Sequence, residues 1–411
     1  MHNLFFSQSK FNYVLLFCLI SFIVPIFFSI EINDFNLSFI KGFGYISQQL
    51  GYEIEEIVAI AIPINFIIIA VVPFLLIISK QNPLKILTFD IMLIIFLTIL
   101  ATIYIYIVYE TIPIRVFKSS FAILYFLFTY NLTSYLIRSI SRKELENIFK
   151  FFVFFSNLII IIYIFNIYFT NSKYNFLFDY TNYQYSTYFP YFIYLLIFIN
   201  LSFIIIHKNI FYILSFVPIY IFISIVGGVS VINSIFLGIL NNYFIGVCLI
   251  GSICLIIFKQ ANSYLNIVKN INLFFFINLF ILNIIIVSFL SFGFLYGKIP
   301  QIDERVRQFY FALNDLNLLS FFGIFGNSGK IGQSGTAHND FLELFSIFGI
   351  FIYFIYSKIY SSLSVICKND FLIYSGILVV IFIGGLSTTV LMSLYLNFYL
   401  AIMLAVYEKK I

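Results

Sequence analysis

Charged residues are scarce in this chain, and their scarcity excludes a water-soluble domain. Only 9% of the 411 residues are charged and 62% are hydrophobic, with a mean hydropathy of +1.07, which leaves too little polar surface to cover a soluble fold. Apolar runs of roughly 17–25 residues recur along the chain, each long enough to cross a membrane as a helix. The short stretches of alternating polarity that are typical of a β-barrel are absent. The sequence therefore predicts an all-α, polytopic transmembrane protein that forms one integral membrane domain over residues 1–411.

Cysteine is also rare, and its placement argues against disulfides and metal binding. Three of the four cysteines fall within predicted spans (Cys18, Cys248 and Cys254), and Cys367 falls in a predicted cytoplasmic loop. No two of them have the spacing of a metal site. The net charge of +5 is spread along the chain without the basic patch of a nucleic-acid-binding protein. We expect no metal, no cofactor and no nucleic-acid partner.

The apolar runs predict about twelve spans, with both termini in the cytoplasm. The first run, 11–30, is longer than the apolar core of a signal peptide and lacks a cleavage site, so we interpret it as a retained span. One set of loops and chain ends carries fourteen Lys and Arg residues and the other set carries eight, and the richer set faces the cytoplasm. The predicted spans are 11–30, 57–79, 87–108, 119–137, 148–169, 189–206, 209–226, 230–258, 272–296, 341–357, 371–388 and 391–407.

Three segments that face outward in this topology are long enough to hold a functional site: 31–56, 171–190 and 297–340. The cytoplasmic loops are short and contain no nucleotide-binding fold, so any chemistry is expected on the outer side. Segment 171–190 is rich in tyrosine. Its rings are open to two interpretations, a surface for sugars or an interfacial aromatic belt.

The long outer loop 297–340 contains Arg305 and Arg307, whose guanidinium groups suit a phosphate ligand. Two residues apart on a helix, they point in very different directions, so one of them is expected to face a ligand. The alternative is that both pair with Asp303 and Glu304 or extend to the membrane surface.

The glycine-rich stretch 323–335 that follows is not a phosphate-binding P-loop. It is either a flexible loop or a hinged lid.

His338, one of only three histidines, stands where this loop meets an apolar helix. One interpretation is structural, with His338 as a capping residue and Asp340 as the N-cap of a helix that begins at Phe341. The other is catalytic, because the ordinary pKa of histidine makes it a usable base near neutral pH. His338 also shares its loop with both candidate phosphate-binding arginines.

The stretch A337-H-N-D-F-L-E-L-F-S-I-F-G349 resembles the His-Asn-x-x-Leu signature of the O-antigen ligase and O-antigen polymerase (Wzy) superfamily. His338, Asn339, Leu342 and Gly349 fall at the matching places, and the segment that begins at Arg307 is similar to the arginine-containing segment of that family. Two departures stand out. Ile347 replaces a frequent glutamate, for which Glu343 can compensate, and 227–233 lacks an arginine, whose charge Arg115 or Lys173 can supply.

The resemblance implies a metal-independent glycosyltransferase in the bacterial inner membrane that joins oligosaccharide repeat units carried on undecaprenyl diphosphate. In this reading His338 is the catalytic residue, and the substrate-binding residues are Arg305, Arg307, Asn339 and Glu343. The implied partners are the lipid-linked glycan, the bilayer and a possible chain-length regulator.

Three other functions stay open at this point. An O-antigen ligase would transfer the finished chain to lipid A core, but the Phe-, Ile-, Tyr- and Asn-rich composition resembles repeat-unit polymerases. A transporter or flippase needs ionisable residues at mid-membrane, and Asp90 lies near a predicted cytoplasmic end. A metal-dependent enzyme would use acidic residues of the first outer segment, such as Glu53, Glu55 and Glu56, although solvation of a helix end explains these as well.

Overall fold

The computed structural model of this chain describes residues 8–21, 23, 64–79, 81–109, 114–169, 192, 195, 196, 198–204, 277, 281, 339–385 and 390–409. Within these ranges the regular structure is helical, with no strand. The elements, with α, 3-10 and π helices together, are α1 (Gln8–Ser21), α4 (Ile64–Ile78), η2 (Pro83–Ile86), α5 (Phe89–Tyr109), α6 (Ile114–Ile137), α7 (Arg142–Phe169), α15 (Asp340–Phe348), η5 (Gly349–Phe351), α16 (Ile352–Asn369), α17 (Phe371–Leu378), η6 (Val379–Gly384), η7 (Val390–Met392) and α19 (Leu394–Glu408).

The predicted all-α class is confirmed for this part of the chain. Two of its helices are long and apolar enough to cross a membrane, Ser119–Ile137 within α6 and Asp340–Asn369, which joins α15, η5 and α16. The predicted spans 209–226 and 230–258 and nearly all of 272–296 lie outside the described residues. The number of spans therefore stays a prediction.

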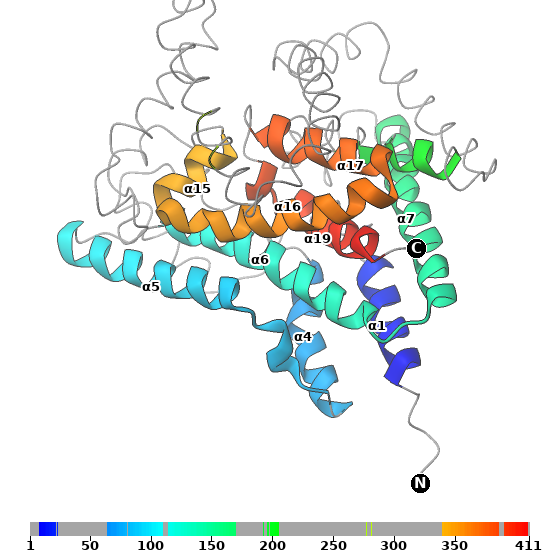
Figure 1. Cartoon of the computed structure of the whole chain (residues 1–411), viewed down its shortest axis with the longest axis horizontal. Helices are drawn as coiled ribbons and strands as arrows, with labels where there is room; N and C mark the ends of the chain where they lie inside the picture. The colour runs from blue at the N-terminus through cyan, green and yellow to red at the C-terminus, as the bar shows by residue number, and fades with distance from the viewer. Residues whose placement is uncertain are drawn as a thin grey trace, which may run out of the picture.

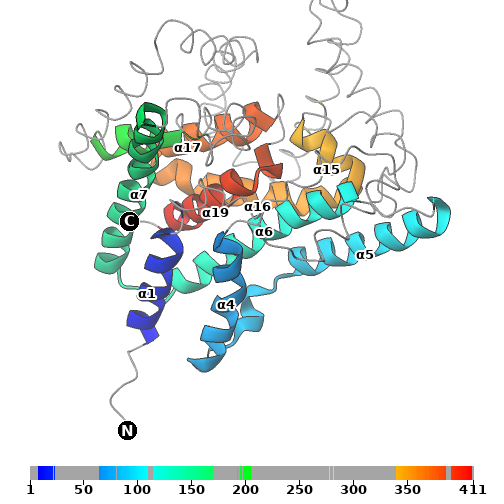
Figure 2. The ribbon, with the colours of Figure 1, turned by 180° about the vertical axis from the view of Figure 1, so that it is seen from behind.

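Helices α6 and α19 form the centre of the described bundle. In both views they run through the middle of the group, with α5 at one edge and α7 at the other (Figures 1 and 2). Every side chain of α19 from Phe398 to Val406 is buried. A helix that is apolar on all sides suits a position away from water, and here α19 lies inside the bundle.

Helix α5 has two faces of opposite exposure. Its inner face, which includes Ile91, Ile94 and Leu97, is buried, mainly against α6. Its outer face carries large apolar side chains with more than half of their surface exposed, at a spacing of three and four residues: Phe89, Met92, Phe96, Ile99 and Ile103. In water such a continuous apolar stripe would be unfavourable.

Buried polar side chains join helices to one another in the interior. Asn157 and Asn200 exchange hydrogen bonds of 3.3 and 3.1 Å, and Thr98 donates to Ser120 at 2.7 Å. Asn12 donates to Ser139 at 2.7 Å. Polar groups that bond inside while apolar groups face outward are the arrangement that a hydrocarbon solvent favours.

The first turn of α7 is stabilised by a capping box, S141-R-K-E144. The Ser141 hydroxyl donates to Glu144 Oε2 at 2.7 Å and its backbone N–H donates to the same atom at 3.0 Å. These hydrogen bonds favour the ionised carboxylate and lower the pKa of Glu144. The reciprocal bonding fixes the start of α7 just before the predicted span 148–169.

Gly349 interrupts the helix that follows His338. Its φ of 56° and ψ of −143° lie in a region that residues with a Cβ rarely adopt. The helix bends there through the 3-10 turn η5, so α15 and α16 point in different directions (Figure 1). The segment 341–357, predicted as a single span, therefore contains two helices joined at a glycine.

We expect Gly349→Ala to lower the free energy of unfolding by about 1–3 kcal/mol, because alanine is strained at this φ. The measurement is thermal unfolding of the purified protein in detergent. The control is Ser361→Ala, an exposed position of α16. Equal stability of the two variants would contradict the strain at Gly349.

The structure also shows that the helix continues beyond the end of this predicted span. Helix α16 continues to Asn369, twelve residues beyond the predicted end at 357. Lys358, which the prediction placed in a cytoplasmic loop, lies on the helix with its side chain 18% exposed. The polar sequence S357-K-I-Y-S-S-L-S was interpreted as a loop, but its helix is stabilised by contacts with other helices, which sequence periodicity does not show.

Candidate functional site

The start of α15 is set by Asn339. Its side-chain Oδ1 accepts a hydrogen bond from the backbone N–H of Leu342 at 2.9 Å, and its carbonyl oxygen accepts from the backbone N–H of Glu343 at 2.9 Å. Asn339 is therefore the N-cap of the helix. The prediction that Asp340 is the N-cap was wrong by one residue, because Asn and Asp are equally good caps and the sequence does not distinguish neighbouring positions.

Asp340 has a different partner. Both of its carboxylate oxygens lie 2.9 Å from the backbone nitrogen of Leu391 in η7, 51 residues away. The side chain is 1% exposed, and among the described residues no lysine or arginine forms an ion pair with it. The carboxylate of Asp340 thus joins the first turn of α15 to the segment that leads into α19.

Glu343, a predicted substrate-binding residue, lies one turn after Asp340 and is fully buried. Asn339, the other predicted substrate-binding residue within the described ranges, is fully buried as well. His338 precedes the described segment by one residue, and Arg305 and Arg307 also lie outside the described residues. The structure brings Asn339 and Glu343 together in one helical turn, and their substrate contacts stay predictions.

Helix α15 lies at one end of the bundle. It contacts both α5 and α6, and both views place it near the N-terminal end of α6, away from α1 and α4 (Figures 1 and 2). The predicted topology puts the connection between α5 and α6 on the outer side. The N-terminus of α15 therefore lies close to the end of the bundle that the predicted topology places on the outer side. That topology rests on the charges of the loops and does not depend on the residues of α15.

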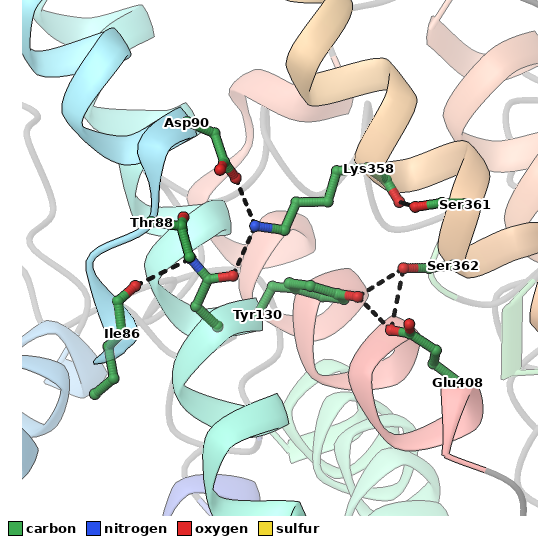
Figure 3. Close-up of polar contacts among 9 residues, drawn as sticks. Ile86, Thr88, Asp90, Tyr130, Lys358, Ser361, Ser362 and Glu408 are labelled. Atoms are coloured by element: carbon green, nitrogen blue, oxygen red, sulfur yellow. Dashed lines mark hydrogen bonds and ion pairs between the residues drawn. The ribbon is translucent and has the colours of Figure 1, made fainter. Parts of the chain in front are cut away.

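A second polar group lies deeper along α16, and we call it the Lys358 cluster: Asp90, Asn131, Lys358, Tyr130, Ser362 and Glu408. Lys358 Nζ donates to Asp90 Oδ2 at 2.5 Å (Figure 3) and to Asn131 Oδ1 at 2.7 Å. It also lies 5.2 Å from the centre of the Tyr130 ring, within the range of a cation–π interaction. The lysine charge is compensated on three sides.

The other half of the Lys358 cluster surrounds Glu408. The hydroxyl of Tyr130 donates to Glu408 Oε2, and Ser362 Oγ lies 3.2 Å from the same oxygen (Figure 3). The Tyr130 and Ser362 hydroxyls are 2.7 Å apart. The cluster therefore links α5, α6, α16 and α19 through polar side chains.

Sequence reasoning missed the Lys358 cluster, and the available signal was limited. Asp90 was recognised as an acidic residue near the end of a span, but its partner is 268 residues away. Burying an unpaired charge is costly, so a charged residue within a helix bundle is expected to have a partner. The sequence does not show which residue that partner is. Because each of its charged groups is bonded to other side chains of the cluster, we assign the cluster to helix packing.

Comparisons of the chain with protein-family profiles, with curated proteins and with solved structures found no match.

Proposed function

We propose that the chain is an integral membrane protein of about twelve spans, with both termini in the cytoplasm. The support comes from the exposed apolar stripe on α5, the hydrogen bonds between buried polar side chains, and the two helices long and apolar enough to cross a bilayer. A hydrocarbon solvent makes this arrangement favourable, because exposed apolar groups cost nothing there and buried polar groups must bond within the protein.

We further propose that it is a polysaccharide polymerase of the bacterial inner membrane. The observation that carries this proposal is the His-Asn-x-x-Leu pattern at 338–342, followed by Gly349. Two positions of the pattern have distinct structural roles, since Asn339 caps α15 and Gly349 adopts a positive φ. Those roles favour a capping residue at position 339 and a glycine at position 349.

The proposed reaction is a glycosyl transfer at the outer membrane surface. His338 removes the proton from a hydroxyl group of the acceptor sugar, and the oxygen attacks the anomeric carbon of the donor glycan. The bond between that carbon and the diphosphate oxygen breaks, and undecaprenyl diphosphate leaves with the bonding electron pair. Arg307, aided by Arg305, stabilises the charge on the leaving diphosphate. Because the diphosphate is already a good leaving group, the reaction balances without a nucleotide or a metal.

Deletion of the gene tests this function through the polysaccharide ladder on a gel. We expect the ladder to collapse to a single repeat unit attached to the lipid A core, because assembly, export and ligation of single units continue. A ligase would instead leave polysaccharide on undecaprenyl diphosphate and none on lipid A core. A full ladder after deletion would contradict both functions, and restoration by the plasmid-borne gene is the control.

A further inference from the structure

We propose that Asp340 is a positioning residue for the reaction, which fixes the start of α15 by binding the backbone of the segment before α19. This inference rests on the proposed function, because the start of α15 matters for catalysis only if His338 is the base. It assigns a role to a residue that the sequence pattern leaves unspecified, and to its neighbours Gly385 and Leu391.

The contact between Asp340 and Leu391 is the first part of the argument. Both carboxylate oxygens accept from the backbone N–H of Leu391 at 2.9 Å. Because the site is buried, water does not compete with this N–H for the carboxyl oxygens, and the contact is directional. The backbone of η7 therefore restrains the side chain of Asp340, and through it the first turn of α15.

Gly385 is the second part of the argument and is independent of the first. A Cβ on Gly385 would lie 3.0 Å from Asp340 Oδ2 and 3.4 Å from Asp340 Cβ. A larger residue there would press on Asp340, whose side chain would have to shift by a few tenths of an ångström. Gly385 directly follows the π-helical segment η6 (Val379–Gly384). Asp340 is thus enclosed by η7 on one side and by the end of η6 on another.

These contacts act on the residues that the proposed reaction uses. Asn339 accepts a hydrogen bond from Leu342 of the same helix, and Asp340 accepts one from Leu391 of η7. Two consecutive residues therefore fix the backbone just after His338. Misplacement of a reacting group by about 1 Å can cost about 100-fold in rate. Loss of the Asp340 contact is therefore expected to lower turnover without removing any group that touches the substrate.

The first comparison is Asp340→Ala against Asp340→Asn in purified protein supplied with a lipid-linked repeat unit. Asn has the same size and its Oδ1 still accepts from Leu391, whereas alanine removes the contact. We expect Asp340→Ala to lower kcat by about 10–100-fold at nearly constant KM, and Asp340→Asn to retain most of the activity. If asparagine fails as badly as alanine, the carboxylate itself reacts and the positioning role is wrong. Full kcat in Asp340→Ala would overturn the proposal as well.

The second comparison is Gly385→Ala against Gly376→Ala. Both glycines are tightly enclosed, but a Cβ on Gly376 would meet Phe198 Cβ at 2.9 Å, not Asp340. We expect both variants to lose abundance, and only Gly385→Ala to lose turnover per molecule of inserted protein. Equal turnover in the two variants would contradict a specific effect through Asp340.

Hydrogen exchange of the peptide 390–397 tests the contact without any activity. The amide of Leu391 is expected to exchange faster in Asp340→Ala than in wild type, and at nearly the wild-type rate in Asp340→Asn. Unchanged exchange in Asp340→Ala would overturn the contact and the proposal. If the wild-type protein makes no polymer while the exchange rates of the variants are as expected, the contact is real but the proposed function is wrong. In that case Asp340 has no role in catalysis.

Discussion

His338→Ala is expected to abolish long polysaccharide while the protein reaches the membrane at normal abundance. The physical reason is that a positioned general base typically contributes about 10²–10⁴-fold in rate. Single-repeat product should accumulate, because the preceding steps of assembly and export do not use this residue. The measurement is the amount of polymer per molecule of inserted protein, from the ladder and an immunoblot of the membrane fraction.

Two controls separate catalysis by His338 from helix capping. Asn339→Ala removes the cap and is expected to cost about 0.5–2 kcal/mol of stability, so abundance should fall more than turnover. Asn339→Asp keeps an oxygen that accepts from Leu342 and should restore abundance. If His338→Ala still makes a full ladder, the residue is not the base. If it behaves like Asn339→Ala, its role is structural.

Lys358→Met is expected to destabilise the bundle by about 3 kcal/mol, the second large effect. The substitution leaves the Asp90 carboxylate, 18% exposed in its side chain, without its cation, and it removes the donor to Asn131. Breaking a buried ion pair on one side costs about 3–5 kcal/mol, and the partial exposure of this pair places it at the lower end. Thermal unfolding in detergent measures the loss.

A double-mutant cycle tests whether Lys358 acts through Asp90. The double variant Asp90→Asn with Lys358→Met has no unpaired charge at this position, so it should be more stable than Lys358→Met alone. Lys150→Met, an exposed lysine of α7, is the control for loss of a positive charge. Additive effects of Asp90→Asn and Lys358→Met would contradict the ion pair.

A transport function, which needs a titrating group at mid-membrane, predicts instead that the Asp90 variants abolish activity at normal stability.

The sequence predicted the position of the helix start at the site but not the residue that caps it. A polar run against an apolar run predicts a helix start, here at Phe341, and the observed helix begins one residue earlier, at Asp340. The choice of cap was wrong by one residue, because Asn339 and Asp340 have similar intrinsic capping strength. What decided between them was Leu391, a residue 51 positions away.

The sequence alone determined that this chain is helical and apolar, and it located most helix boundaries in the described part to within a few residues. Hydrophobic run length and local capping signals are properties of neighbouring residues, so they can be read along the chain. The exception was the helix through Lys358, whose polar sequence resembles a loop. Only the tertiary structure decided that Lys358 pairs with Asp90 and that Asp340 binds Leu391. The physical reason is that the burial of a charge requires a partner, but its identity depends on which helices pack together.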